Sequence, residues 1–161
     1  MISSIALLFV CVSVCTAHLC MLSPPQRSAL NDINKAGSDS CILLDGPCGK
    51  VTPSVSKLFL QGGANLTVVF QKNLDHFNSV SPGYWSVSIG DEANNGTFKE
   101  LYRTADTSIP SLSLLTAVIT VPEPVGTKGE HMVLQTQYVT KNPKAPPVFY
   151  QCADIVIMKR N

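Results

Sequence analysis

The stretch YWSVSI at positions 84–89 indicates most directly how this chain folds. Trp85, Val87 and Ile89 alternate with more polar residues, so they share one face of an extended strand whose other face is less apolar. Further segments are rich in Val, Ile, Thr and aromatic residues and are bounded by Gly, Pro or Asn. These predicted strands are 57–60, 65–71, 114–121, 131–139 and 148–158.

The pattern outside these segments predicts an all-β domain. No window of twelve residues shows a convincing helical period, and eleven prolines argue against long helices. Six or more short strands in 161 residues predict an antiparallel β-sandwich of immunoglobulin-like or fibronectin-like form. The segment 18–56, rich in Pro, Gly, Ser and Cys, is expected to be irregular, with at most one helical turn at 31–36. We see no repeat or linker, so one domain is expected over residues 18–161.

The first 17 residues have the pattern of a secretory signal. An apolar run from Ile5 to Cys15 is interrupted only by Ser13, and small residues stand one and three positions before a cut after Ala17. The run is too short to span a bilayer, which needs about 20 apolar residues. The sequence therefore predicts that residues 1–17 are removed, and that a secreted, extracellular chain without a transmembrane segment begins at His18.

Cysteine usage agrees with an oxidising compartment. Cleavage would leave four of the six cysteines: Cys20, Cys41, Cys48 and Cys152. An even number in a secreted chain predicts two disulfides, and three pairings remain open. A zinc site would need closer cysteine pairs than these.

Two glycosylation acceptor triplets, at Asn65 and Asn95, also fit secretion. The net charge of +1 and the scattered basic residues argue against a nucleic-acid partner. Nothing in the pattern suggests assembly, so a monomer is expected.

The chain has only three histidines, and two of them suggest a metal site. A terminal His18 would offer its amine and ring Nδ1 as a chelate. His76 lies in a loop between two predicted strands, where functional residues often sit. An amine and two imidazoles give three nitrogens in one plane, which suits Cu(II) and not tetrahedral zinc. His131 opens a predicted strand and is better explained as structural, although it is the alternative second imidazole.

Three stretches resemble a known family. They are HLCMLSPPQR at 18–27, the loop from His76 to PGYW at 82–85, and PVFYQCADI at 147–155. Together they resemble the histidine-brace copper proteins, which comprise the lytic polysaccharide monooxygenases and their short copper-acquisition (Bim-type) relatives. The resemblance implies that His18 supplies the amine and Nδ1 and that His76 supplies Nε2.

The same resemblance offers two candidates for a further position at the metal. Phe149 is the nearest match to the axial Phe of chitin-active members, and Asp154 matches the Asp ligand of the copper-acquisition relatives. A regular strand places residues five apart on opposite faces, so it cannot bring both to one metal. An apolar neighbour leaves copper open for oxygen chemistry, whereas a carboxylate favours tight holding of Cu(II).

We therefore expect a secreted copper-binding protein that serves copper binding or uptake, with a membrane copper importer as a possible partner. The alternative is a lytic polysaccharide monooxygenase acting on chitin or a related glycan. Against it, the chain is short, has no carbohydrate-binding module, and carries its single Trp on a face that reads as core. A third alternative is a metal-free extracellular recognition module in which His18 is incidental. No catalytic residue is assigned from the sequence.

Overall fold

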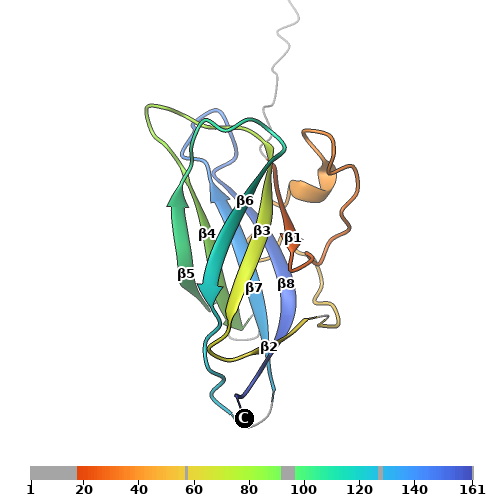
Figure 1. The fold of residues 1–161 in the computed structure, drawn as a ribbon. Helices are drawn as coiled ribbons and strands as arrows, with labels where there is room; N and C mark the ends of the chain where they lie inside the picture. Colours follow the sequence, from red (N-terminus) through yellow and green to blue (C-terminus); the bar gives the residue numbers. More distant parts are fainter. Residues whose placement is uncertain (1–17, 57, 92–96, 127–128, 161) are drawn as a thin grey trace, which may run out of the picture.

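A computed structural model describes residues 18–56, 58–91, 97–126 and 129–160 as two facing β-sheets (Figure 1). One sheet has the order β1-β3-β6 and the other the order β2-β8-β7-β4-β5. Neighbouring strands are antiparallel except β2 and β8, which are parallel. The strands are β1 (His18–Ser23), β2 (Leu58–Gln61), β3 (Asn65–Leu74), β4 (Tyr84–Asp91), β5 (Thr97–Ala105), β6 (Ser113–Thr120), β7 (Glu130–Val139) and β8 (Val148–Met158). The predicted all-β sandwich is confirmed.

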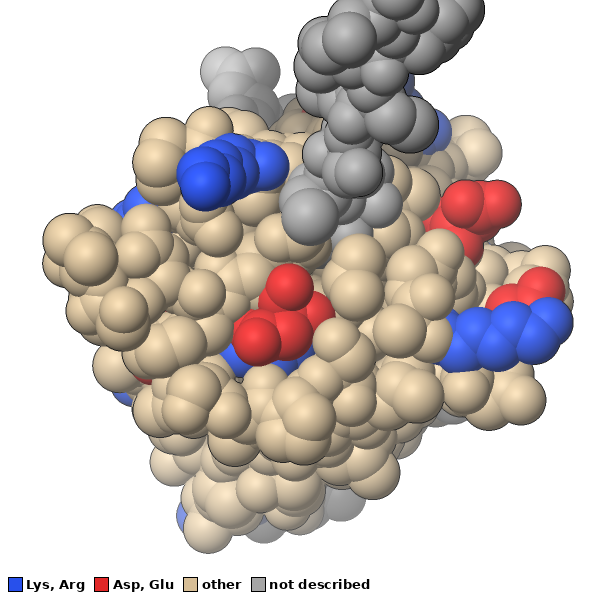
Figure 2. Space-filling model, turned by 90° about the horizontal axis from the view of Figure 1, so that it is seen from above, with Lys and Arg blue, Asp and Glu red and all other residues tan. Residues whose placement is uncertain are grey.

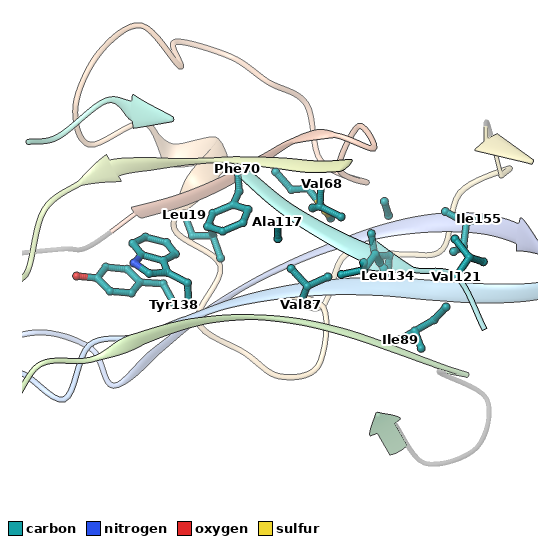
Figure 3. Close-up of a cluster of buried hydrophobic side chains, with 14 of the residues drawn as sticks. Leu19, Val68, Phe70, Val87, Ile89, Ala117, Val121, Leu134, Tyr138 and Ile155 are labelled. Atoms are coloured by element: carbon teal, nitrogen blue, oxygen red, sulfur yellow. The ribbon is translucent and has the colours of Figure 1, made fainter. Parts of the chain in front are cut away.

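The core lies between the two sheets and is built by the alternation that the sequence shows (Figure 3). Trp85, Val87 and Ile89 of β4 are all buried on the inner face. The Trp85 ring stacks on Tyr138 of β7 with 3.8 Å between ring centroids, and Phe70 of β3 packs against it at 5.6 Å. Trp85 is therefore a core residue that joins the two layers, as its strand face predicts.

Strand β5 is one that the sequence pattern did not reveal. It lies at the edge of the five-stranded sheet and pairs only with β4 among the described strands. Charged side chains such as Lys99, Glu100 and Arg103 interrupt its apolar alternation. Edge strands often carry such charges because they discourage pairing with other chains, and this hides their period.

The expectation of irregular structure over residues 18–56 is wrong for its first six residues. They form β1, which pairs with β3 through partners such as Cys20 and Gln71. Leu19 and Met21 are fully buried in the core, and this burial stabilises the strand. The rest of the segment consists of turns and the short 3-10 helix η1 (Asp39–Cys41).

Two disulfides hold this segment against the sandwich, as the cysteine count predicts. Cys20 of β1 bonds to Cys41 of η1, and Cys48 bonds to Cys152 of β8. The structure thus resolves the pairing that the sequence leaves open. Among the described residues, no helix is long and apolar enough to cross a membrane.

Candidate metal centre

One end of the sandwich gathers the start of β1 and the loops that follow β3, β5 and β7 (Figure 1). Seen from above in Figure 2, the visible surface of this end is mostly uncharged, with isolated acidic and basic side chains. Both sequence-predicted histidine ligands belong to this end, because His18 begins β1 and His76 follows β3. The Cα partner of His18 across the two strands is Leu74, so His76 lies two residues beyond it.

His18 lies at an irregularity in the pairing of β1 with β3, where β3 has one extra residue, Asn73. The register of β1 against β3 shifts between His18 and Leu19, and such a bulge re-aims a side chain. The His18 side chain is buried, and its ring stacks on Phe149 of β8 with 6.5 Å between centroids and 19° between planes. The two sheets therefore meet at this imidazole.

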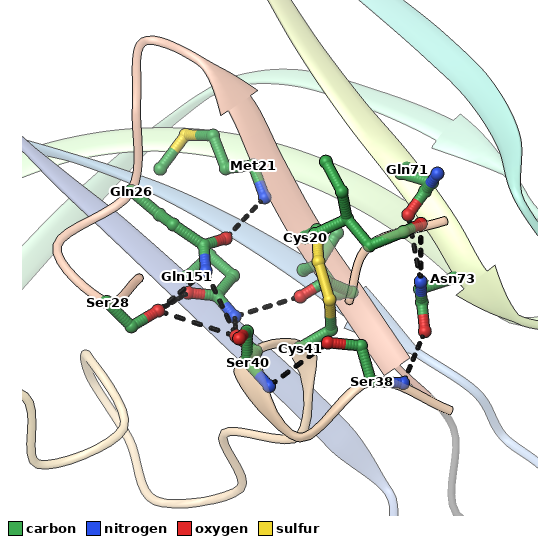
Figure 4. Close-up of a disulfide and its surroundings, with 12 residues drawn as sticks. Cys20, Met21, Gln26, Ser28, Ser38, Ser40, Cys41, Gln71, Asn73 and Gln151 are labelled. Carbon is green, nitrogen blue, oxygen red and sulfur yellow. Dashed lines mark hydrogen bonds between the residues drawn. A yellow bond between two sulfur atoms is a disulfide. The ribbon is translucent and has the colours of Figure 1, made fainter. Parts of the chain in front are cut away.

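Side-chain amides fix the edge of β1 that does not face β3 (Figure 4). Gln26 accepts the N–H of Met21 at 2.8 Å, and Gln151 donates to the carbonyl of Leu19 at 2.9 Å. Both amides also donate to the carbonyl of Ser40, each at 3.0 Å. Together with the Cys20–Cys41 disulfide, these bonds hold the strand that carries His18.

Bonds within and between loops hold the chain around His76. The Asp75 carboxylate accepts the N–H of Phe77 at 2.8 Å, and the N–H of Asp75 donates to Ser111 Oγ at 2.9 Å. Asn142, from the loop between β7 and β8, donates its amide to the His76 carbonyl at 3.1 Å. Loops after three different strands therefore fix one short turn.

The imidazole of His76 carries the decisive feature of this end. The side chain is buried, and within the described part of the chain its Nε2 has no hydrogen-bond partner. An unsatisfied buried polar group costs about 1–3 kcal/mol and is rare in native proteins. The only other such atom among the described residues is the hydroxyl oxygen of Thr136, in the middle of β7. A metal ion at His76 Nε2 would satisfy a nitrogen that the protein leaves without a partner.

A buried polar network centred on Asp106 reaches the residue before His76. Its carboxylate accepts hydrogen bonds from Lys72 Nζ at 2.8 Å, from Trp85 Nε1 at 3.2 Å and from the Tyr138 hydroxyl at 2.6 Å. Lys72 also pairs with Asp75, the neighbour of His76. Burial raises the pKa of Tyr138, and the bond to Asp106 raises it further, so the hydroxyl stays protonated and donates. No short sequence motif predicts this network, because its members come from four separate segments of the chain.

Asp154 lies away from this end. It is on β8 five residues after Phe149, about 17 Å along a strand, and faces away from the core. Both of its carboxylate oxygens accept from the Arg27 guanidinium, at 2.7 and 2.9 Å, and Ser54 donates its N–H at 2.8 Å. Burial alone would raise the pKa of Asp154, but the bonds from Arg27 and Ser54 outweigh it and lower the pKa below the usual 3.8. The structure therefore brings Phe149, and not Asp154, to His18.

The other residues predicted from the sequence also have defined places. His131 is exposed on β7, its ring Nδ1 3.5 Å from Ser56 Oγ, and it lines a pocket of about 230 Å³ on the Asp154 side of the molecule. Asn65 is exposed at the start of β3, and its side-chain oxygen accepts from the Thr120 hydroxyl at 3.3 Å. The predicted signal peptide and Asn95 lie outside the described residues.

Comparison with protein-family models gives one match, over residues 16–161, to the copper acquisition factor BIM1-like domain. The chain belongs to this BIM1-like family. The predicted resemblance is confirmed, and copper is the metal that the family assigns to this chain. A comparison with curated proteins finds no match.

Solved structures show the BIM1-like chain's fold in other proteins. An AA10 lytic polysaccharide monooxygenase from Streptomyces lividans has a TM-score of 0.51 and 15% sequence identity, over 86% of this chain and 99% of that one. A lytic polysaccharide monooxygenase important for efficient utilization of chitin in Cellvibrio japonicus has a TM-score of 0.53 and 12% identity, over 86% and 98%. At these identities the likeness shows a shared sandwich fold.

Among the described residues, no three His, Cys, Asp or Glu side chains gather as a metal site. The candidate centre therefore consists of two imidazoles, from His18 and His76, with the aromatic ring of Phe149 beside the first. A carboxylate does stand next to His76, since Asp75 precedes it, but that group pairs with Lys72. Imidazole nitrogens suit copper better than they suit Mg²⁺ or Ca²⁺, which prefer oxygen.

Proposed function

We propose that the protein binds one copper ion between the imidazoles of His18 and His76. The observation that carries the proposal is the buried Nε2 of His76, which has no partner among the described residues. His18 supports it, because β1 places this residue at the same end and turns its ring inward. Copper bound there would supply one-electron redox chemistry and an acceptor for nitrogen lone pairs.

Cleavage after Ala17 would complete the site by freeing the amine of His18. The free amine and the ring Nδ1 of one residue can then close on the same ion, which an internal histidine cannot do. An α-amine has a reference pKa of about 7.7–8.0, so losing its proton to a competing metal costs little near neutral pH. Secretion and the creation of the copper site would then depend on one cut.

The physiological role that we propose is the capture and holding of extracellular copper for uptake, with delivery to a membrane importer as the next step. Membership of the BIM1-like copper acquisition family supports this role. The rigid support of both histidines is what a binding protein needs, because a preformed site loses little entropy on metal binding.

A copper titration of protein that begins at His18 tests the site directly. The protein has a single Trp, buried against Tyr138, so quenching of its fluorescence reports metal arriving near the end of the sandwich. We expect one copper per chain and a nitrogen-rich axial electron paramagnetic resonance spectrum. His18→Ala, His76→Ala and an uncleavable tag ahead of His18 should each lose that spectrum.

His131→Ala is the matched control, since it removes an exposed imidazole on the other side of the molecule. It should bind copper like the parent. Equal copper affinity in all three histidine variants would show that the site is elsewhere.

One observation favours a second candidate function, that of a lytic polysaccharide monooxygenase. Phe149, rather than a carboxylate, packs beside His18, and an apolar neighbour leaves room for oxygen at a bound copper. The test is the release of oxidised oligosaccharides from chitin or cellulose by the copper-loaded protein with ascorbate as electron donor. If the parent releases such products and His76→Ala does not, the protein is a monooxygenase. If no glycan of a broad panel is oxidised, the result supports the role in copper uptake.

A further inference from the structure

We infer that Asn142 is a positioning residue for His76. Its amide nitrogen donates to the His76 carbonyl at 3.1 Å across 66 residues of sequence. No motif in the sequence singles out Asn142, and it lies in a loop rather than beside either histidine in the chain. The expected effect on copper binding rests on the proposed function. The hydrogen bond itself does not depend on any metal.

Asn142 is suited to this role because its own loop is closed by internal hydrogen bonds. Thr140 binds Pro147 through its N–H at 3.1 Å and Pro146 through its hydroxyl at 2.9 Å. The side-chain oxygen of Asn142 accepts the N–H of Lys144 at 2.9 Å, and its backbone carbonyl accepts the N–H of Ala145 at 3.1 Å. The amide group that reaches His76 therefore has a fixed orientation.

The loop also ends directly at the strand that carries Phe149. Val139 and Val148 are Cα partners across β7 and β8, so residues 140–147 close the hairpin between these strands. One end of the loop thus leads to the aromatic ring beside His18, while Asn142 holds the backbone of His76. The loop couples the two halves of the candidate site.

Asn78, two residues after His76, provides a comparison with Asn142. Asn78 accepts the N–H of Val80 at 3.1 Å, a bond that stays within its own turn. Asn78 and Asn142 line the same pocket of about 270 Å³, between the loops after β3 and β7. Asn142, unlike Asn78, donates a hydrogen bond from one of these loops to the other, and its acceptor is the carbonyl of His76. Metal ligands must be held to within about 0.5 Å, so losing this support matters for binding.

The experiment compares Asn142 with Asn78 in the mature protein. In metal-free protein, Asn142→Asp keeps the oxygen that accepts from Lys144 and removes the donor to His76. We expect nitrogen relaxation to show a more mobile His76 backbone and imidazole in this variant. Asn78→Ala removes an amide from the same pocket without touching His76, and it should leave that mobility unchanged.

With copper, Asn142→Ala should lower the affinity roughly tenfold, as loss of a supporting contact typically does, and should change the copper hyperfine coupling. Asn78→Ala should match the parent in both measurements. Parent-like mobility in Asn142→Asp, or parent-like affinity and spectrum in Asn142→Ala, would overturn the assignment. A loss of melting temperature alone would show a merely structural role. If the parent holds no copper through His76, the proposed function fails, while the relaxation measurement still decides whether Asn142 positions the histidine.

Discussion

Strand β8 carries two residues that could each belong to a copper site, and their surroundings differ in kind. Phe149 faces the core, where its ring packs on His18 and on Tyr138. Asp154, further along the strand, faces the other way and is tied to Arg27 and Ser54. Phe149 thus contacts a histidine ring of the candidate site, whereas Asp154 is held in an ion pair on the other face of the strand.

The difference is between a polar group whose hydrogen bonds are satisfied and one that has no partner among the described residues. A carboxylate with two bonds from a guanidinium and one from a backbone N–H has little capacity left for a metal. The Nε2 of His76 is buried and unsatisfied within the described chain, so an added ion removes a cost there instead of breaking bonds. The satisfaction of polar atoms distinguishes the two regions better than residue type does.

The largest effect that we expect from this comparison is in Asp154→Ala. The Arg27 and Asp154 side chains are only 2% and 9% exposed, so the variant removes the carboxylate that pairs with a buried guanidinium. Breaking such a pair costs about 3–5 kcal/mol, and urea unfolding should show a loss of about 3 kcal/mol. Copper affinity of the folded variant should stay at the parent value.

Asp45→Ala is the matched control, because its partner Lys50 is 77% exposed and Asp45 itself 56%. An exposed pair contributes only about 0–1 kcal/mol, so this variant should unfold close to the parent. If a folded Asp154→Ala protein no longer binds copper, Asp154 is a copper ligand. The contrast between Phe149 and Asp154 would then be wrong.

A smaller effect should follow from Phe149→Leu, which tests the other part of the strand. The substitution keeps an apolar side chain in the core and should cost about 1 kcal/mol of stability. It removes the ring beside His18, so the electron paramagnetic resonance spectrum of bound copper should change. Phe70→Leu is the control: Phe70 is equally buried but packs on Trp85, and its loss should leave the spectrum as it is.

Much of the fold is predictable from local pattern. The alternation in β4 and the apolar segments of β3, β6, β7 and β8 give six strands when β2 is included, with bounds that differ from the structure by at most three residues. Pattern fails at β5, where charges at a sheet edge mask the period, and at β1, which is short and stands beside prolines and cysteines. Both strands form because of contacts with residues that are distant in the sequence. A short window of sequence does not show these contacts.

The candidate site is predictable only in part, for the same reason. His18 and His76 can be named from the signal pattern, their positions relative to the strands and a family resemblance. Asn142 and Asp106 cannot, because their roles depend on loops that meet only after folding. The resemblance also offered both Phe149 and Asp154, and strand alternation alone could not choose between them. The ion pair between Arg27 and Asp154 favours Phe149 as the residue beside the candidate site.

The smallest expected effect is a difference in acid stability that isolates the Asp154 pair. Its pKa in the folded protein lies below the ordinary 3.8, so the pair contributes stability above that pH and loses it as pH falls through the folded pKa. Metal-free parent protein should therefore lose stability below about pH 4 more steeply than Asp154→Asn, measured by urea unfolding from pH 5 to pH 2. Copper is removed first because its release at low pH, when histidines become protonated, would also change the stability of both proteins. If the free energy of unfolding falls equally with pH in the two proteins, Arg27 does not stabilise the ionised carboxylate of Asp154. The ion pair would then be no argument against Asp154 as a metal ligand.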